Sequence, residues 1–232
     1  MLLPHRRMYL AAFLMDCAFM AGYTVVPFFV LNQLGGGAGM IGTISALQSI
    51  GYAAVSLVSA PFVRHARNGL HFALVGIAGY IVLFGLAPLL TRSPALYAVL
   101  SMAGCGSMGL VWPALWSWIG AEPDLALRAK RISNYNVSWS IGLTLGPAIA
   151  GPLYHAGYWY PFVGIMTLAG LVWLLVLSVP HEKEHFEAIT DTEEVQQQRI
   201  AYSRLSNAHL YCAWCANFLS LMLVGACRSV YA

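Results

Sequence analysis

Seven apolar stretches, each long enough to cross a lipid bilayer as a helix, account for most of the 232-residue chain. A crossing helix needs about 20 apolar residues, because its backbone polar groups must all be satisfied within the helix. Charged clusters, Gly and Pro divide the sequence into spans at Met8–Leu31, Met40–Val63, Leu70–Leu90, Ala95–Ala121, Ser133–His155, Tyr158–Val179 and Asn207–Ala226. The pattern predicts an all-α, polytopic membrane helix bundle of six transmembrane helices plus a seventh.

The composition excludes a soluble globule. Hydrophobic residues make up 59% of the chain and charged residues 9%, whereas soluble domains carry about 25% charged residues. The net charge of +3 is small, so the lipid bilayer, and no nucleic acid, is the expected partner. The links between most spans are short, which predicts that consecutive helices pack as antiparallel neighbours.

The basic residues between the spans predict the orientation. Short cytoplasmic loops hold the excess of Lys and Arg. Arg92 is the only such residue on one side, and the other side holds Arg6, Arg7, Arg64, Arg67, Arg128, Lys130 and Arg131. We therefore expect a multi-pass protein of the plasma or inner membrane with a cytoplasmic N-terminus.

Three regions are expected along the chain. Residues 1–180 form an N-terminal six-helix transmembrane bundle, residues 181–206 form a cytoplasmic linker, and residues 207–232 form the first helix of a truncated C-terminal bundle. The linker is the only long polar segment, with six acidic residues against three basic ones. It is expected to be a solvated segment or a surface amphipathic helix.

The fifth span carries a pattern of small residues, Gly142-Leu-Thr-Leu-Gly146-Pro147-Ala-Ile-Ala-Gly151. Gly142 and Gly146 share one helix face, where a second backbone can approach closely, and Pro147 can open a kink. This resembles the G-x-x-x-G-P-x-x-x-G signature of the major facilitator superfamily, which is commonest in its antiporters. The resemblance extends over the whole chain and implies a membrane transporter.

The superfamily's loop motif between the second and third helices is present only in outline. Arg64 and Arg67 match its basic positions, but Val63 stands where an aspartate is expected and Ala66 where a glycine is expected. The superfamily's usual molecule has twelve helices in two related halves. The resemblance therefore implies a missing C-terminal half, or a half-transporter that pairs as a homodimer.

Asp16 is the one acidic residue within a predicted span. A carboxylate at the centre of a bilayer costs roughly 2.5–3.5 kcal/mol on insertion scales, so it is kept out of lipid and usually marks a pathway. We expect Asp16 to face the central cavity and to exchange the coupling proton. The alternative is a structural role, in which Asp16 caps a kink or bonds a neighbouring helix.

Polar and aromatic residues at helical spacing could line the path of an amphipathic substrate. The substrate-cavity candidates are Tyr23, Gln48, Tyr52, Trp112, Trp116, Asn136 and Trp139. Some aromatic residues at span ends, such as Trp118, Trp159 and Tyr160, could instead form an interfacial belt.

Three short motifs known from soluble proteins lie in contexts that disfavour their usual chemistry. The G-x-G-x-x-G run from Gly104 to Gly109 lies inside an apolar helix and is expected to be a packing surface. Cys212 and Cys215 lie in an apolar span. His181 and His185 fit a zinc-protease spacing, but in an acid-rich linker. We expect no enzyme activity, no cofactor and no metal.

The predicted function is secondary active transport of a small organic solute or drug-like molecule. Transport by alternating access, proton-coupled and antiport-like, fits Asp16, and no G-x-x-x-x-G-K-[ST] motif for ATP is present. The alternative is a non-transporting membrane protein or an inactive half-transporter fragment.

Overall fold

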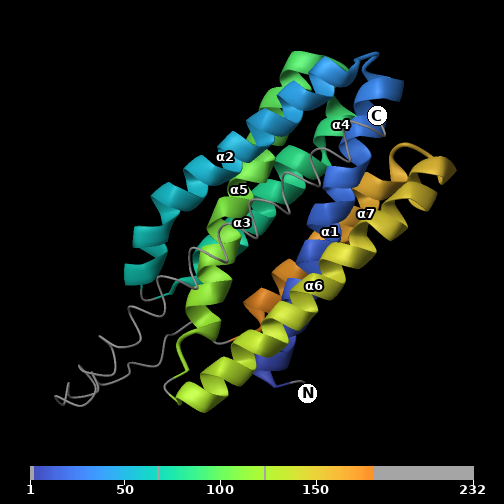
Figure 1. Ribbon diagram of the computed structural model, residues 1–232. Helices are drawn as coiled ribbons and strands as arrows, with labels where there is room; N and C mark the ends of the chain where they lie inside the picture. Colours follow the sequence, from blue (N-terminus) through green and yellow to red (C-terminus); the bar gives the residue numbers. More distant parts are fainter. Residues whose placement is uncertain (1–2, 67, 123, 180–232) are drawn as a thin grey trace. The chain divides into compact units, whose positions relative to one another are not determined.

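The computed structural model describes residues 3–66, 68–122 and 124–179, which lie in the first of two compact units, Met1–Glu184. Every regular element in this part of the chain is helical, which confirms the predicted fold class (Figure 1). The elements are α1 (Pro4–Gln33), α2 (Ala38–His65), α3 (Leu70–Gly79), the π-helical segment η1 (Tyr80–Gly85), α4 (Ala87–Leu90), α5 (Pro94–Ile119), α6 (Leu125–Ala156) and α7 (Tyr160–Leu177).

Five helical stretches of the described chain are long and apolar enough to cross a membrane. They are Pro4–Gln33, Ala38–Val63, Leu70–Leu90, Pro94–Ile119 and Tyr160–Leu177. Five of the predicted spans fall on these stretches. The predicted span Ser133–His155 lies within α6, whereas the predicted span Asn207–Ala226 lies outside the described residues.

Helix α6 is longer than its apolar run. Its 32 residues extend about 48 Å at 1.5 Å per residue, whereas the hydrocarbon core of a bilayer is about 30 Å thick. The two additional turns at its N-terminal end carry Arg128, Lys130 and Arg131. The sequence prediction began this helix at Ser133 because it assigned the three cations to a loop, and the structure corrects that boundary to Leu125.

The third predicted span is not one regular helix. After α3 the chain continues in the π-helical segment Tyr80–Gly85, followed by the four-residue helix α4. Pro88 lies at the start of α4, where its missing N–H removes no helical hydrogen bond. The sequence predicts an unbroken helix here because apolar periodicity does not distinguish π-helical from α-helical turns.

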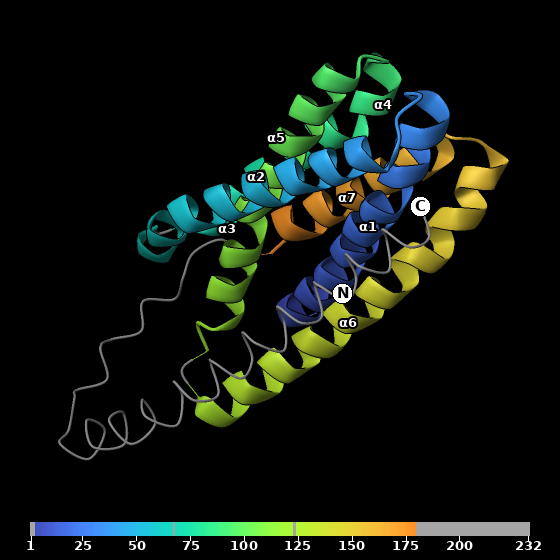
Figure 2. The ribbon, with the colours of Figure 1, turned by 45° about the horizontal axis from the view of Figure 1, so that its top comes forward.

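The closest helix pairs are not consecutive in the chain. Helix α1 packs mainly on α6 and α7, and α2 packs mainly on α5. Helix α3 contacts both α5 and α7 and so connects these groups (Figure 2). The expectation that consecutive helices are the main neighbours is wrong for α1–α2, α2–α3, α5–α6 and α6–α7. A short loop fixes where a helix begins but not which face packs.

Small residues explain why α2 and α5 pack closely. A Cβ at Gly51 would lie 2.6 Å from the carbonyl oxygen of Met102, and one at Gly109 would lie 2.6 Å from the backbone nitrogen of Ser56. The hydroxyl of Ser59 donates to the carbonyl of Gly109 at 2.9 Å. The G-x-G-x-x-G run is therefore a helix-packing surface, as predicted, and Ser56 and Ser59 of α2 pack against it.

Candidate functional site

Asp16 lies midway along α1, on the side that packs against α6. It is 2% exposed. A Cβ added at Gly142 of α6 would lie 3.0 Å from the Cβ of Asp16. Its Oδ2 is buried and has no hydrogen-bond partner among the described residues. The carboxyl is therefore enclosed between the two helices rather than displayed on the surface of the bundle.

Glycines of the Gly142–Gly151 motif, which lies on α6, create this close approach. A Cβ at Gly142 would contact the carbonyl oxygen of Phe13, and one at Gly146 would lie 2.5 Å from the carbonyl oxygen of Cys17. Both obstacles are backbone atoms, which cannot rotate away as a side chain can. Gly151, by contrast, has nothing within 4 Å of an added Cβ. The first two glycines hold α1 against α6, and the third does not.

Tyrosines from two other positions approach the carboxyl. Tyr52 of α2 and Tyr135 of α6 lie close enough to Asp16 to interact with it electrostatically. Tyr135 is 1% exposed, and its ring meets Trp116 of α5 edge-on, with the ring centroids 5.1 Å apart. Four helices thus contribute to one cluster, which we name the Asp16 centre: Asp16, Tyr52, Trp116 and Tyr135.

The Asp16 centre continues along α1 through an aromatic contact. The ring centroids of Phe19 and Tyr52 are 6.3 Å apart, and the ring centroids of Phe19 and Tyr23 are 4.9 Å apart. Gln48, one turn before Tyr52 on α2, is buried, and its Nε2 has no hydrogen-bond partner among the described residues. Tyr23 and Gln48 are therefore placed toward the interior of the bundle.

The other candidates are more exposed. Trp112 is partly buried, whereas Trp116, Asn136 and Trp139 reach the surface of the described bundle, with exposed fractions of 42% for Trp116 and 36% for Trp139. Asn136 and Trp139 are both exposed side chains of α6. The structure therefore joins Trp116 to the Asp16 centre and leaves Asn136 and Trp139 outside it.

Sequence reasoning did not select Tyr135 as a site residue. The available signal was its spacing of seven residues from Gly142, which places both on one helix face. This spacing identifies Tyr135 as a neighbour of Asp16 only once this face of α6 is known to pack on α1. Tyr135 enters the site through tertiary packing.

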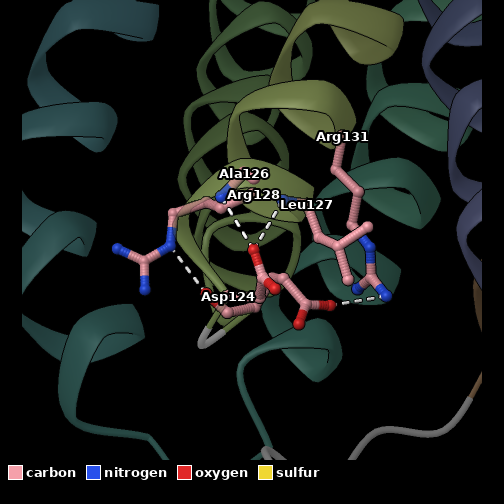
Figure 3. A network of polar contacts seen from close by, with 6 residues as sticks. Asp124, Ala126, Leu127, Arg128 and Arg131 are labelled. Atoms are coloured by element: carbon pink, nitrogen blue, oxygen red, sulfur yellow. Dashed lines mark hydrogen bonds and ion pairs between the residues drawn. The ribbon is translucent and has the colours of Figure 1, made fainter.

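A polar network begins α6 (Figure 3). Asp124 is the N-cap, and its carboxylate accepts hydrogen bonds from the second and third backbone N–H groups of the helix, at 2.8 and 3.0 Å. The Nε of Arg128 donates to the carbonyl of Glu122 at 2.6 Å, and Arg131 pairs with the Glu122 carboxylate at 2.6 Å. These contacts fix the end of α6 nearest the N-terminus of α1.

Comparison with known proteins agrees with the architecture. The protein-family model of the Major Facilitator Superfamily matches residues 8–231, which is nearly the whole chain. The chain belongs to the major facilitator superfamily. No curated protein sequence matches it. Membership makes this a multi-pass membrane protein of a family of secondary transporters, not of enzymes.

The superfamily's loop motif falls at the C-terminal end of α2. Ser59 and Val63 are buried, and the helix ends at His65. The side chain of Arg64 and all of Arg67 lie outside the described residues. The match of these two arginines to the loop motif stays a prediction.

An apolar groove lies on another face of this superfamily bundle. It encloses about 330 Å³ between α2, α3 and α5, and Ser59, Phe62, Phe72 and Leu110 are among its lining residues. None of its lining residues belongs to the Asp16 centre. The groove is therefore separate from the Asp16 centre, and its apolar walls suit the hydrocarbon of a bilayer.

Arg92 connects three segments at the opposite end of the bundle. This side chain donates to the hydroxyl of Tyr158 at 2.7 Å and lies over the same ring, 4.7 Å from its centroid. It also reaches the side-chain oxygen of Gln33 at 3.5 Å. The end of α1, the α4–α5 link and the α6–α7 link thus meet at one cation.

The remaining sequence motifs lie outside the described residues. These are the histidine pair His181 and His185 and the cysteine pair Cys212 and Cys215. Within the described ranges, no three His, Cys, Asp or Glu side chains gather as they would around a metal ion.

Proposed function

We propose that this member of the superfamily carries a small organic or drug-like solute across the plasma or inner membrane in exchange for protons, with Asp16 as the coupling carboxyl. The observation that carries the proposal is the enclosure of Asp16. It is a carboxyl deep in a membrane-spanning helix, with a buried oxygen that no described residue hydrogen-bonds.

The chemistry of such a carboxyl supports exchange. Without a proton, it leaves a negative charge in a low-dielectric interior, which is unfavourable unless a counter-charge is present. The sequence of α1 carries no Lys or Arg beyond Arg7, and the titratable groups that interact with Asp16 among the described residues are Tyr52, Tyr135 and Cys17. Binding of a cationic solute would compensate the charge when the proton leaves. Proton and solute would then compete for one site, which is the condition for antiport.

Aromatic residues support an amphipathic solute. Trp116 is half-exposed and touches Tyr135, so its indole connects the surface of the bundle with the buried part of the Asp16 centre. Indole and phenol faces attract organic cations through their π electrons. The proposed substrate is therefore a small aromatic or aliphatic cation.

Alternating access requires a second bundle that rocks against the first. We propose that it comes from further sequence of the same protein or from a second copy of the chain. The exposed surfaces of α2 and α6 support this, because they are available to a partner as well as to lipid. Crosslinking in native membranes distinguishes a homodimer from a longer chain.

Vesicle transport tests the coupling. Ethidium, an aromatic monocation, is the probe, and a pH gradient is the driving force. Asp16→Asn should abolish gradient-driven ethidium transport, because the amide keeps the size and hydrogen-bonding capacity but not the titratable proton. Asp16→Glu is the matched control and should retain part of the transport. A well-expressed Asp16→Asn protein that still couples ethidium flux to the pH gradient would disprove the role of Asp16.

A further inference from the structure

Helices α1 and α6 run side by side in the same direction. Gly142 faces Phe13, Asp16 and Cys17, whereas Gly146 faces Cys17, Met20 and Ala21. A step of four residues along α6 therefore corresponds to a step of about four residues along α1. Both helices run from the end that holds the N-terminus of the chain toward the opposite end (Figure 1).

This register predicts which residues of α1 and α6 lie at the same height along the two helix axes nearer the N-terminus. Tyr9 precedes Asp16 by seven residues, and Tyr135 precedes Gly142 by seven residues. Seven residues are nearly two full turns, so each tyrosine lies on the same helix face as its successor. Tyr9 and Tyr135 therefore share one level, two turns from Asp16 toward the N-terminal end.

Both tyrosine hydroxyls are buried, and neither has a hydrogen-bond partner among the described residues. Such groups are rare in folded proteins, because each leaves hydrogen-bonding capacity unused. Tyr135 interacts electrostatically with both Asp16 and Tyr52. Its buried hydroxyl therefore lies within electrostatic range of the carboxyl.

His5 lies beyond Tyr9, at the N-terminal end of α1. The rings of His5 and Tyr9 lie 5.9 Å apart, one turn from each other on α1. Two cations lie near His5, since it interacts electrostatically with Arg131 of α6 and with Arg6. Arg131 in turn lies one turn before Tyr135 and is paired with Glu122 at 2.6 Å. His5 is partly exposed, so it can exchange protons with water.

We propose that His5, Tyr9 and Tyr135 line the route by which protons move between the N-terminal end of the bundle and Asp16. The inference rests on the proposed function, because it assumes that Asp16 titrates. A phenol can carry a proton onward by accepting one at its oxygen while releasing its own. The net change is the loss of one proton from water at His5 and its gain by the Asp16 carboxylate, and no other bond changes.

Distances require water within the route. The level of the tyrosines and that of Asp16 are about 10 Å apart at 1.5 Å per residue, which exceeds one hydrogen bond. A tyrosine side chain spans part of this distance, and water bound to the two hydroxyls completes it. The groups that face the carboxyl along this route are Tyr135, Tyr52 and, on its own helix, Cys17.

Removing the hydroxyls separates this route from simple packing. Tyr9→Phe and Tyr135→Phe keep the rings, and the loss of a buried unsatisfied hydroxyl should not reduce stability. Tyr97→Phe is the matched control. Tyr97 is also fully buried with an unpartnered hydroxyl, but it packs on Phe29, a residue far along α1 from Asp16, with ring centroids 5.0 Å apart.

The measurement is time-resolved infrared spectroscopy of the purified chain in lipid nanodiscs after a drop in pH. The carboxyl band of Asp16 is identified by its loss in Asp16→Asn. Protonation should slow by about tenfold or more in the double variant Tyr9→Phe/Tyr135→Phe, and the single variants should slow it partly. Tyr97→Phe should leave the rate unchanged.

An unchanged protonation rate in a double variant with the wild-type melting temperature would overturn the route while leaving the proposed function intact. An equal slowing in Tyr97→Phe would also overturn it. Absence of any band that depends on Asp16 would overturn the proposed function, and the route with it. If the double variant does not fold, the single variants decide by the same comparison.

Discussion

Replacing Gly146 by alanine should separate α1 from α6. The added Cβ would lie 2.5 Å from the carbonyl oxygen of Cys17, whereas ordinary van der Waals contact begins near 3.4 Å. One helix must therefore move by about 0.9 Å, the difference between these distances. Overpacking of this kind costs typically about 1–3 kcal/mol.

The same substitution at Gly151 is the matched control. It lies in the same motif and the same helix, but nothing lies within 4 Å of an added Cβ. Alanine favours a helix over glycine by up to about 1 kcal/mol at either position. Gly151→Ala should therefore be neutral or stabilising, and Gly146→Ala should be less stable than Gly151→Ala by about 1–3 kcal/mol.

Thermal unfolding of both variants in one detergent provides the assay. For a chain of this length, each kcal/mol shifts the midpoint by roughly 2–4 °C. Gly146→Ala should melt several degrees below Gly151→Ala. Equal melting temperatures would refute the argument that backbone contact at Gly146 holds the two helices together.

Three further predictions concern the orientation and the two ends of the bundle. A single cysteine at Lys130 should react only with reagents added from the cytoplasmic side, and one at Gly37 only from the outside; the reverse pattern would contradict the orientation. Asp124→Ala should lower the stability by about 1 kcal/mol through loss of the N-cap, measured by thermal unfolding, whereas Asp124→Asn should retain most of it. Arg92→Lys should weaken the contact with Tyr158, because an ammonium lacks the planar fork of a guanidinium. Proteolysis of the loops at this end should then become faster, and an unchanged cleavage rate would contradict the stabilising role of Arg92.

The spans could be predicted from the sequence because the bilayer imposes a length on every apolar run. The start of α6 could not, since Arg128, Lys130 and Arg131 occupy a helix that extends beyond the hydrocarbon. Its start depends on the cap made by Asp124. A charged helix and a charged loop have the same composition, so only the structure distinguishes them.

The candidate site was predictable only in part. Asp16 could be selected because a lone carboxyl in a span is costly wherever it lies. A close helix contact at Gly142 also follows from the spacing of small residues, but the identity of α1 as the partner helix does not. Tyr135 could not be selected, because its importance arises from the register between α1 and α6, which no local pattern determines.

The most direct test of the account is the release of protons when a cationic solute binds. Ethidium is added to the purified protein in weakly buffered detergent solution, and released protons are followed with a pH indicator. The account predicts that the wild-type protein releases protons as ethidium binds and that Asp16→Asn binds ethidium without releasing any. Equal release from both proteins, or none from the wild type at saturating ethidium, would contradict it.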